Sequence, residues 1–338
     1  MRASSAVLTD TTFRLWELAF PSSRALLART RAAYVHLDNL IAFSKRDRDG
    51  KVDAYLAVYL PDEVALLFFL GGDLVNAAIL TSGGRFQASI SEAMRHIRSE
   101  PERAEIAFHE ASREQLAAMY ATCSQTPQEL GLDASSAETV FRALLDRRWS
   151  GLLELIARGQ VNYILVRDGR FASGLFAERG SDDTPAGRVA RLFTVPPGEA
   201  KARVVAKAFA GLGAMPLQAP PPMVNMFRHF IWDLMDLAEG EMPGDAGKRS
   251  ERIRLKLVPE HDVLRSVGGV RGSEFADPIV EPRVLVDAIA AWVREFLGEL
   301  EIVHPQIALR LLREAGREHR FALNAVEFFD KLPWRIQW

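Results

Sequence analysis

The chain has little cysteine, little excess charge and no long apolar run. Its 338 residues include one cysteine, Cys123, which excludes an intrachain disulfide and fits a reducing compartment. Lys and Arg total 42 and Asp and Glu total 44, so the formal net charge of −2 offers no basic excess for nucleic-acid binding. The 48% hydrophobic and 25% charged residues are ordinary for a globular chain of about two domains.

Segments that enter membranes are also lacking. The longest apolar run has seven residues, Val64–Leu70, whereas a membrane-spanning helix needs about 20. The stretch Met1–Asp10 carries one basic residue and no apolar core of the kind that a signal peptide has. We therefore expect a cytoplasmic protein with no membrane insertion, and its Ala-, Arg- and Leu-rich composition is bacterial in style.

Motifs of catalytic chemistry are absent from the sequence. The histidines show no metal-ligand spacing, and no basic neighbour activates the thiol of Cys123. Asp47–Gly50 lacks the first and twelfth ligands of a calcium loop. The glycine-rich Gly268–Ser273 lacks the Lys-Ser/Thr ending of a phosphate loop, although Arg271 within it is a candidate for anion contact. We expect no catalytic residue, no metal and no cofactor.

Proline and glycine divide the remaining sequence. Pro220–Pro222 closes a segment, 213–222, that we predict to be an extended linker. Further breaks fall at Gly240–Ser250 and at Gly268–Gly272. At the other end of the chain, Thr9 or Asp10 caps a predicted helix over Thr11–Phe20, and a second helix is expected after Pro21.

An internal repeat at a spacing of about 97 residues is the most informative pattern. Each copy predicts a helix, a three-stranded meander, a helix and a last strand. The first copy comprises Leu37–Ser44, Val52–Leu60, Val64–Leu70, Leu74–Leu80, Phe86–Ile97 and Ala104–His109. The second comprises Ala137–Leu145, Gly151–Ala157, Gln160–Arg167, Phe171–Phe176, Pro185–Phe193 and Ala202–Ala208. The alignment is anchored on two hairpins with tight Gly or Asp-Gly turns, Phe68–Ala78 and Ile164–Gly174.

This repeat resembles the PATAN domain family of bacterial response-regulator-associated and motility-associated proteins. The first copy matches through Leu37–Ala42, Leu67–Ala78, Glu92–Ile97 and Glu105–Glu110, and the second through Leu165–Gly174. Together the two copies cover roughly residues 32–210, and the second departs further from the family pattern after Gly180. It implies a non-catalytic interaction or signalling module and supplies no catalytic residue. A receiver-domain pattern is missing, so the resemblance does not extend to phosphorelay control.

The C-terminal third is predicted to be helical. Apolar residues recur three and four positions apart over 223–239 and again over Pro282–Leu300. Pro305 suits the first turn of another helix, and Ala322–Lys331 is a last helical segment before Pro333. Such stripes form a core, or a groove that takes a partner helix.

Two groups of residues in this third are candidates for binding. Arg310, Arg313, Arg317 and Arg320 form one basic stripe if they share a helix. This stripe is a solvated, salt-bridged face or recognises an acidic protein surface, and binding of a nucleotide or a nucleic acid is the remaining alternative. Trp334 and Trp338 either dock onto their own domain or anchor a partner.

The sequence therefore predicts an α+β protein with two tandem helix–β-meander–helix–strand repeats followed by an all-α C-terminal domain. The expected division is a helical lead-in (1–31), two PATAN-like repeats (32–125 and 126–212), the linker (213–222) and the helical domain (223–338). We expect a non-enzymatic adaptor or scaffold in bacterial signalling, polarity or surface motility. Its partners would be other proteins and not nucleic acid, and a homo-oligomer is open. The alternative is a sensor that binds a small anion or a nucleotide, cyclic nucleotides included, between the repeats and the helical domain.

Overall fold

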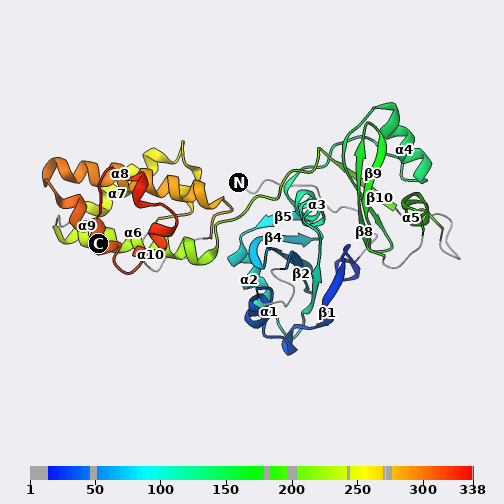
Figure 1. The fold of residues 1–338 in the computed structure, drawn as a ribbon, viewed down its shortest axis with the longest axis horizontal. Coiled ribbons are helices and arrows are strands. Elements are labelled where there is room, and N and C mark those ends of the chain that lie inside the picture. Colours follow the sequence, from blue (N-terminus) through cyan, green and yellow to red (C-terminus); the bar gives the residue numbers. More distant parts are fainter. Residues whose placement is uncertain are drawn as a thin grey trace. The chain divides into compact units, whose positions relative to one another are not determined.

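The computed structural model describes residues 14–45, 52–178, 183–195, 204–241, 244–268, 271, 276–336 and 338. The chain forms two compact units (Figure 1). The first, here the sheet unit, comprises Met1–Ala88 and Ala93–Pro216, and the second, the helical unit, comprises Ser89–Glu92 and Leu217–Trp338. The predicted α+β class is confirmed, and so is a helical C-terminal region. Asp47–Gly50 and most of the glycine-rich segment 268–273 lie outside the described residues.

The sheet unit contains a larger antiparallel sheet with the strand order β1-β6-β2-β3-β4-β5. Its strands are β1 (Arg24–Arg31), β2 (Ala54–Tyr59), β3 (Glu63–Leu70), β4 (Asp73–Thr81), β5 (Gly84–Ala88) and β6 (Glu105–Glu110). Its helices are α1 (Leu37–Phe43), α2 (Ile90–Ser99) and α3 (Arg113–Ser124). Every residue of β2 is buried, which is why this strand is a continuous apolar run instead of an alternating one.

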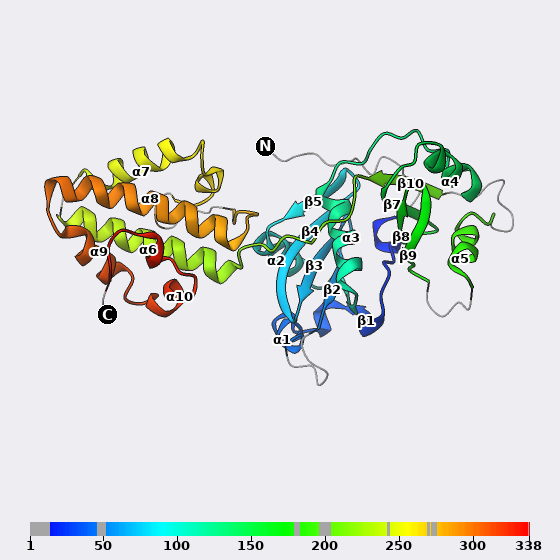
Figure 2. The same cartoon turned by 45° about the horizontal axis from the view of Figure 1, so that its top comes forward.

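The smaller antiparallel sheet has the order β10-β7-β8-β9. Its elements are α4 (Ala137–Asp146), β7 (Gly151–Ala157), β8 (Gln160–Arg167), β9 (Arg170–Leu175), α5 (Pro185–Leu192) and β10 (Val204–Phe209). The last strand returns to lie beside the first strand of the meander, as β6 lies beside β2 in the larger sheet. Figure 2 shows this sheet with α4 and α5 nearby.

The β3–β4 and β8–β9 hairpins have the same turn. Both central residues are left-handed in each, with φ of 55° and 81° at Gly71 and Gly72, and 50° and 75° at Asp168 and Gly169. Such turns match the twist of the strands that they join. In each hairpin, the second turn residue donates its N–H to a carbonyl that lies just before the preceding strand. Gly72 donates to Val52, before β2, at 2.9 Å, and Gly169 donates to Trp149, before β7, at 2.7 Å.

A side chain completes each turn in the same way. Gly71 N–H donates to Asp53 Oδ1 at 2.6 Å, and Asp168 N–H donates to Ser150 Oγ at 2.8 Å. Gly71 and Asp168 therefore occupy equivalent positions in the two turns. The predicted hairpin alignment, which set Phe68 against Ile164 and so Gly71 against Arg167, is wrong by one residue because the turn positions determine the register.

The N-terminal prediction of helices is wrong in its described part. Only Leu15–Glu17 forms a single 3-10 turn, and the segment after Pro21 is the strand β1. β1 pairs with β6, so long-range pairing determines its conformation against the local helical propensity. A similar correction applies to the predicted helix Phe86–Ile97, because its first residues belong to β5 and α2 begins at Ile90.

The two sheets share one apolar cluster. It contains Tyr55, Leu66 and Phe68 from the larger sheet, together with Leu152 and Tyr163 from the smaller one. The segment Leu18–Phe20 and helix α3 contribute to the same cluster.

The segment Leu18–Phe20 is hydrogen-bonded to both sheets. The Tyr59 hydroxyl donates to the Leu18 carbonyl at 2.9 Å, and the Tyr55 hydroxyl donates to the Phe20 carbonyl at 3.3 Å. On the other side, the Ala19 N–H donates to the Gly159 carbonyl of the smaller sheet at 2.9 Å.

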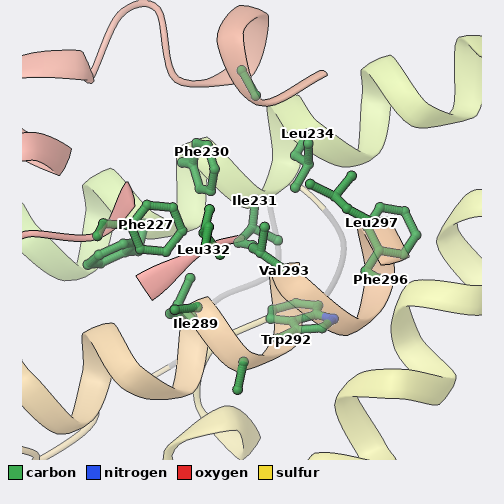
Figure 3. Packing of buried hydrophobic residues seen from close by; sticks show 14 of the residues in the cluster. Phe227, Phe230, Ile231, Leu234, Ile289, Trp292, Val293, Phe296, Leu297 and Leu332 are labelled. Carbon is green, nitrogen blue, oxygen red and sulfur yellow. The ribbon is translucent and has the colours of Figure 1, made fainter. Parts of the chain in front are cut away.

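The helical unit is built from α6 (Pro221–Glu241), α7 (Ala246–Leu257), α8 (Pro282–Val303), α9 (Ile307–Ala315) and α10 (Arg320–Ala325). Its core interleaves α6 and α8 side chains such as Phe230, Leu234 and Phe296 (Figure 3). The predicted stripes over 223–239 and Pro282–Leu300 are confirmed as core. Pro221 and Pro222 lie in the first turn of α6, where proline is tolerated, so the predicted extended segment ends before them. The last predicted helix is shorter than expected, since α10 ends at Ala325.

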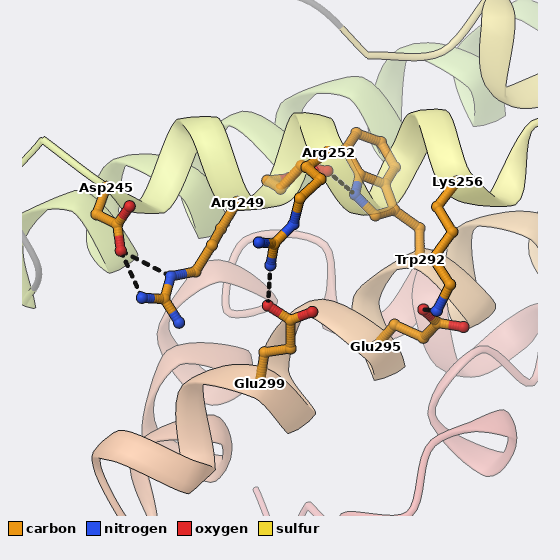
Figure 4. A network of polar contacts seen from close by, with 8 residues as sticks. Asp245, Arg249, Arg252, Lys256, Trp292, Glu295 and Glu299 are labelled. Atoms are coloured by element: carbon orange, nitrogen blue, oxygen red, sulfur yellow. Dashed lines mark hydrogen bonds and ion pairs between the residues drawn. The ribbon is translucent and has the colours of Figure 1, made fainter.

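Ion pairs join α7 to α8 on the outside of the helical unit. Arg252 pairs with Glu299 at 2.5 Å and Lys256 pairs with Glu295 at 3.0 Å (Figure 4). Beneath them, the Trp292 indole N–H donates to the Ser250 carbonyl at 3.1 Å. The basic face of α7 is therefore largely compensated by acidic residues of its neighbour. Among the described residues, no helix has the length and apolarity that a membrane crossing requires.

Candidate binding surface

A groove with a volume of about 520 Å³ opens between α6 and α10 in the helical unit. Apolar side chains and two imidazoles line it: Pro220, Pro222, Met223, Asn225, Met226, His229, His319, Ala322 and Val326. The first two turns of α6 form one wall. The turn after α9 and the short helix α10 form the other, and bring His319 to 6.3 Å from His229 between ring centroids.

The chemistry of this groove favours apolar contact. Two flexible thioether side chains, Met223 and Met226, line the groove, and both also pack on the core of the unit. Methionine adapts to partners of irregular shape because its unbranched chain repacks easily. Beside the groove, Phe321 is 75% exposed, and the Arg320 guanidinium carbon lies 4.5 Å from its ring centroid. Neither His229 nor His319 belongs to a metal-binding cluster in the part of the chain that the structure describes.

The predicted basic stripe is not on one helix. α9 ends at Ala315, so Arg310 and Arg313 lie on α9, Arg317 lies in the following turn, and Arg320 begins α10. Gly316 and the following turn interrupt the helix that the spacing requires. Arg310 pairs with Glu241 at 2.7 Å, at the edge of a second, more polar cavity of about 490 Å³ that His304 and Gln306 also line.

Arg271 is also compensated. Its guanidinium lies 2.6 Å from a carboxylate oxygen of Asp233 and 3.3 Å from one of Asp236, both on α6. Both carboxylates contact the same guanidinium nitrogen, Nη2, and compensate its charge. The structure therefore pairs Arg271 with α6, and Arg310 pairs with Glu241 at the end of the same helix.

The two C-terminal tryptophans contact their own unit. Trp334 packs against the helical core, and the Trp338 ring lies 5.6 Å from the Phe329 ring in an edge-on arrangement. Of the two alternatives for this tail, docking on its own domain is the one observed. Trp338 is still 43% exposed, so part of its ring faces solvent close to the connection between α9 and α10.

A buried polar cluster lies between the two sheets of the sheet unit. Arg85 on β5 and Glu154 on β7 form an ion pair at 2.5 Å, with side chains 4% and 0% exposed. Cys123 on α3 and Tyr163 on β8 interact electrostatically with both charges. Burial raises the pKa of the Cys123 thiol to about 11 and holds the pKa of Tyr163 well above its usual value. Arg85 is a basic neighbour of Cys123 that the sequence did not indicate, and it acts to lower the thiol pKa, but burial has the larger effect and favours the neutral thiol.

Sequence reasoning missed both the His229–His319 groove and the Arg85–Glu154 pair. Arg85 and Glu154 are 69 residues apart and belong to different sheets, so no local spacing connects them. The polar residue Glu154 within the apolar segment Gly151–Ala157 was a visible signal, because buried strands rarely carry an unpaired charge. Comparisons with family models, curated proteins and solved structures found no match to this chain.

Proposed function

We propose that this chain is a non-enzymatic adaptor whose helical unit binds a segment of another protein in the α6–α10 groove. The observation that carries the proposal is the open groove of about 520 Å³ with its apolar, methionine-containing walls. An occupant would bury an apolar side chain between Met223, Met226 and Val326. The exposed Phe321, with Arg320 over its ring, would extend the contact beyond the groove.

We further infer that the sheet unit contains two copies of one α+β module, as its resemblance to the PATAN family implies. Three features support this inference: the return of the last strand to the first, the left-handed turns at Gly72 and Gly169, and the matched hydrogen bonds to Val52 and Trp149. Such modules would fit a role in bacterial signalling, polarity or surface motility.

The polar groups that are best suited to catalysis favour the adaptor over an enzyme. Arg85, Glu154, Cys123 and Tyr163 lie inside the cluster between the sheets, with exposed fractions of 4% or less. A substrate cannot reach these groups while the sheets are packed. The compensated charges of Arg271 and Arg310 likewise favour the adaptor over an anion or nucleotide sensor.

The test uses a photo-cross-linking amino acid placed at Ala322, which lines the groove and is exposed. The control position is Leu255 on α7, which is 56% exposed and lies outside the groove. A protein captured only from Ala322 is then purified and titrated against the full chain. We expect Ala322→Trp to weaken its binding at least about tenfold and Leu255→Trp to leave it unchanged.

Two results would contradict the proposal. One is equal capture from both positions. The other is a captured partner whose affinity does not respond to Ala322→Trp, because the added indole fills the space that an occupant needs.

A further inference from the structure

The interface between the two sheets contains a buried ion pair, whose neighbours are the Cys123 thiol, the Tyr163 ring and apolar side chains. Arg85 Nη1 lies 2.5 Å from Glu154 Oε1, and the other carboxylate oxygen, Oε2, has no hydrogen-bond partner among the described residues. The apolar cluster around this interface includes Phe68, Leu152 and Phe209. Two charges have therefore been removed from water at a substantial desolvation cost.

The packing of strands does not itself require this charge. Glu154 is the fourth residue of β7 and is paired with Tyr163 on β8. The fourth residue of β2 is Ala57, paired with Leu66 on β3, and both of these are buried apolar residues. An apolar residue serves at this strand position in the larger sheet. The charge on β7 must therefore have another reason.

Arg85 supplies that reason because it comes from the other sheet. β5 is the edge strand of the larger sheet, and α3 packs against it. A contact between apolar layers tolerates small sliding motions, whereas a buried ion pair is satisfied in one alignment only. Displacing β5 from β7 would leave two buried charges without each other and draw water into the interface.

We propose that the Arg85–Glu154 ion pair is a latch that holds the two sheets of this unit closed, so that loss of either charge opens the interface beside α3. Opening would expose Thr122 and Cys123 at the end of α3, together with the apolar cluster behind them. The latch is independent of the α6–α10 groove, so either proposal can fail without the other.

The chain carries its own reporter for this opening. Cys123 is the only cysteine of the sequence and is 2% exposed in the closed interface. Its reaction rate with a thiol reagent measures how often the interface opens, because the reagent cannot reach the buried sulfur. The full-length chain is labelled at a fixed pH, and its global unfolding is followed in urea in parallel.

Glu154→Gln and Arg85→Met each remove one charge. We expect labelling of Cys123 to become about a hundredfold faster in either variant, beyond what the measured change in global unfolding accounts for. The double variant Arg85→Met with Glu154→Leu leaves no buried charge, and we expect its labelling to return close to the original rate. Arg24→Met breaks the exposed Arg24–Glu110 pair of the same unit and should leave the rate unchanged.

The result that overturns the latch is labelling of both single variants at the original rate. Labelling of the double variant as fast as the single variants also overturns it, because side-chain shape and not charge would then close the interface. If a single variant fails to fold, a folded and slowly labelled double variant supports the proposal. If the single variant and the double variant both fail to fold, the proposal is contradicted.

Discussion

The interface between the two sheets buries its charged side chains, whereas the interface between α7 and α8 leaves them at the surface. Between the sheets, the ion pair is inside, with Arg85 and Glu154 at 4% and 0% exposure. Between the helices, the inside is apolar and the ion pairs are outside, with Arg252 and Glu299 at 66% and 37%. Burial makes the loss of one charge costly, whereas water screens the exposed pair. The same kind of contact therefore specifies an alignment in one place and adds little in the other.

The helical unit has a buried ion pair of its own, with a different setting. Arg228 and Asp277 are 2.6 Å apart, with side chains 10% and 8% exposed. Arg228 also donates to the carbonyls of Ser266 and Ala276 at 3.3 Å and 3.2 Å. This arginine therefore anchors the chain that leads into α8 through backbone acceptors. The pair between the sheets joins two strands instead, which is what makes it sensitive to their alignment.

The largest expected effect comes from disrupting the apolar core of the helical unit. Phe296 on α8 is 0% exposed in the helical core, so Phe296→Ala removes a ring and leaves a cavity. We expect the free energy of unfolding to fall by about 3–5 kcal/mol, measured by urea denaturation with circular dichroism. Leu255→Ala, at an exposed site of the neighbouring helix, should cost less than about 0.5 kcal/mol. A loss below about 1 kcal/mol for Phe296→Ala would mean that this core is not closely packed.

A smaller effect tests the likeness of the two hairpins in the sheet unit. At Gly169 an added Cβ would meet the Leu144 carbonyl at 2.7 Å, and at Gly72 it would meet the Ser44 carbonyl at 2.6 Å. Both positions also have a positive φ, so we expect Gly72→Ala and Gly169→Ala each to cost about 2–3 kcal/mol in urea unfolding. Gly131 has a φ of 56° with nothing within 4 Å, and Gly131→Ala should cost about 1 kcal/mol. Unequal losses of stability from Gly72→Ala and Gly169→Ala would contradict the likeness of the two hairpins.

Alkaline pH tests the interface between the two sheets through its buried thiol. Burial raises the pKa of Cys123 from 9.0 to about 11, so the folded state favours the neutral thiol. That contribution is complete below pH 9 and is lost as the pH rises toward 11. We expect the free energy of unfolding to fall by about 2 kcal/mol between pH 8 and pH 10.5 from this group. The free energy of unfolding of Cys123→Ala should depend less on pH over this range. An unchanged pH dependence would show that the Cys123 thiol does not cause the loss.

The smallest expected effect belongs to the exposed ion pairs. Glu299→Gln removes the partner of Arg252 on the outside of α7 and α8. We expect a loss of about 0.2–1 kcal/mol in urea unfolding at low salt, and no difference from the original chain in 1 M sodium chloride, where such charges are screened. A larger loss that persists at high salt would show that the Arg252–Glu299 ion pair contributes more to stability than its exposure implies.

The fold was predictable where apolar periodicity matched the local structure. The stripes of α6 and α8 were readable from spacing, and the Asp168-Gly169 turn was readable from its residue types. The strand β1 was not readable, because Arg24–Arg31 forms a strand only through its pairing with β6. The interruption after Ala315 was missed because Gly316 and the turn behind it fall within a regular spacing of arginines.

The candidate surface was predictable only in part. The sequence singled out Arg320 and Trp338, yet the residues that line the groove include His229 and His319, on elements that are distant in sequence. Residues that meet only through tertiary packing leave no periodic trace. The charge at Glu154 was visible, and its partner Arg85 was not, because nothing local marks which strand will face another sheet.

The indole of Trp292 makes α7 observable from within α8. It is 3% exposed and bound to the Ser250 carbonyl, whereas the other five tryptophans are at least partly open to solvent. Its fluorescence should therefore arise at the short-wavelength edge of the emission and shift to the red when α7 separates from α8. A chain that retains Trp292 alone would give the helical unit an optical signal of its own, distinct from events between the two sheets.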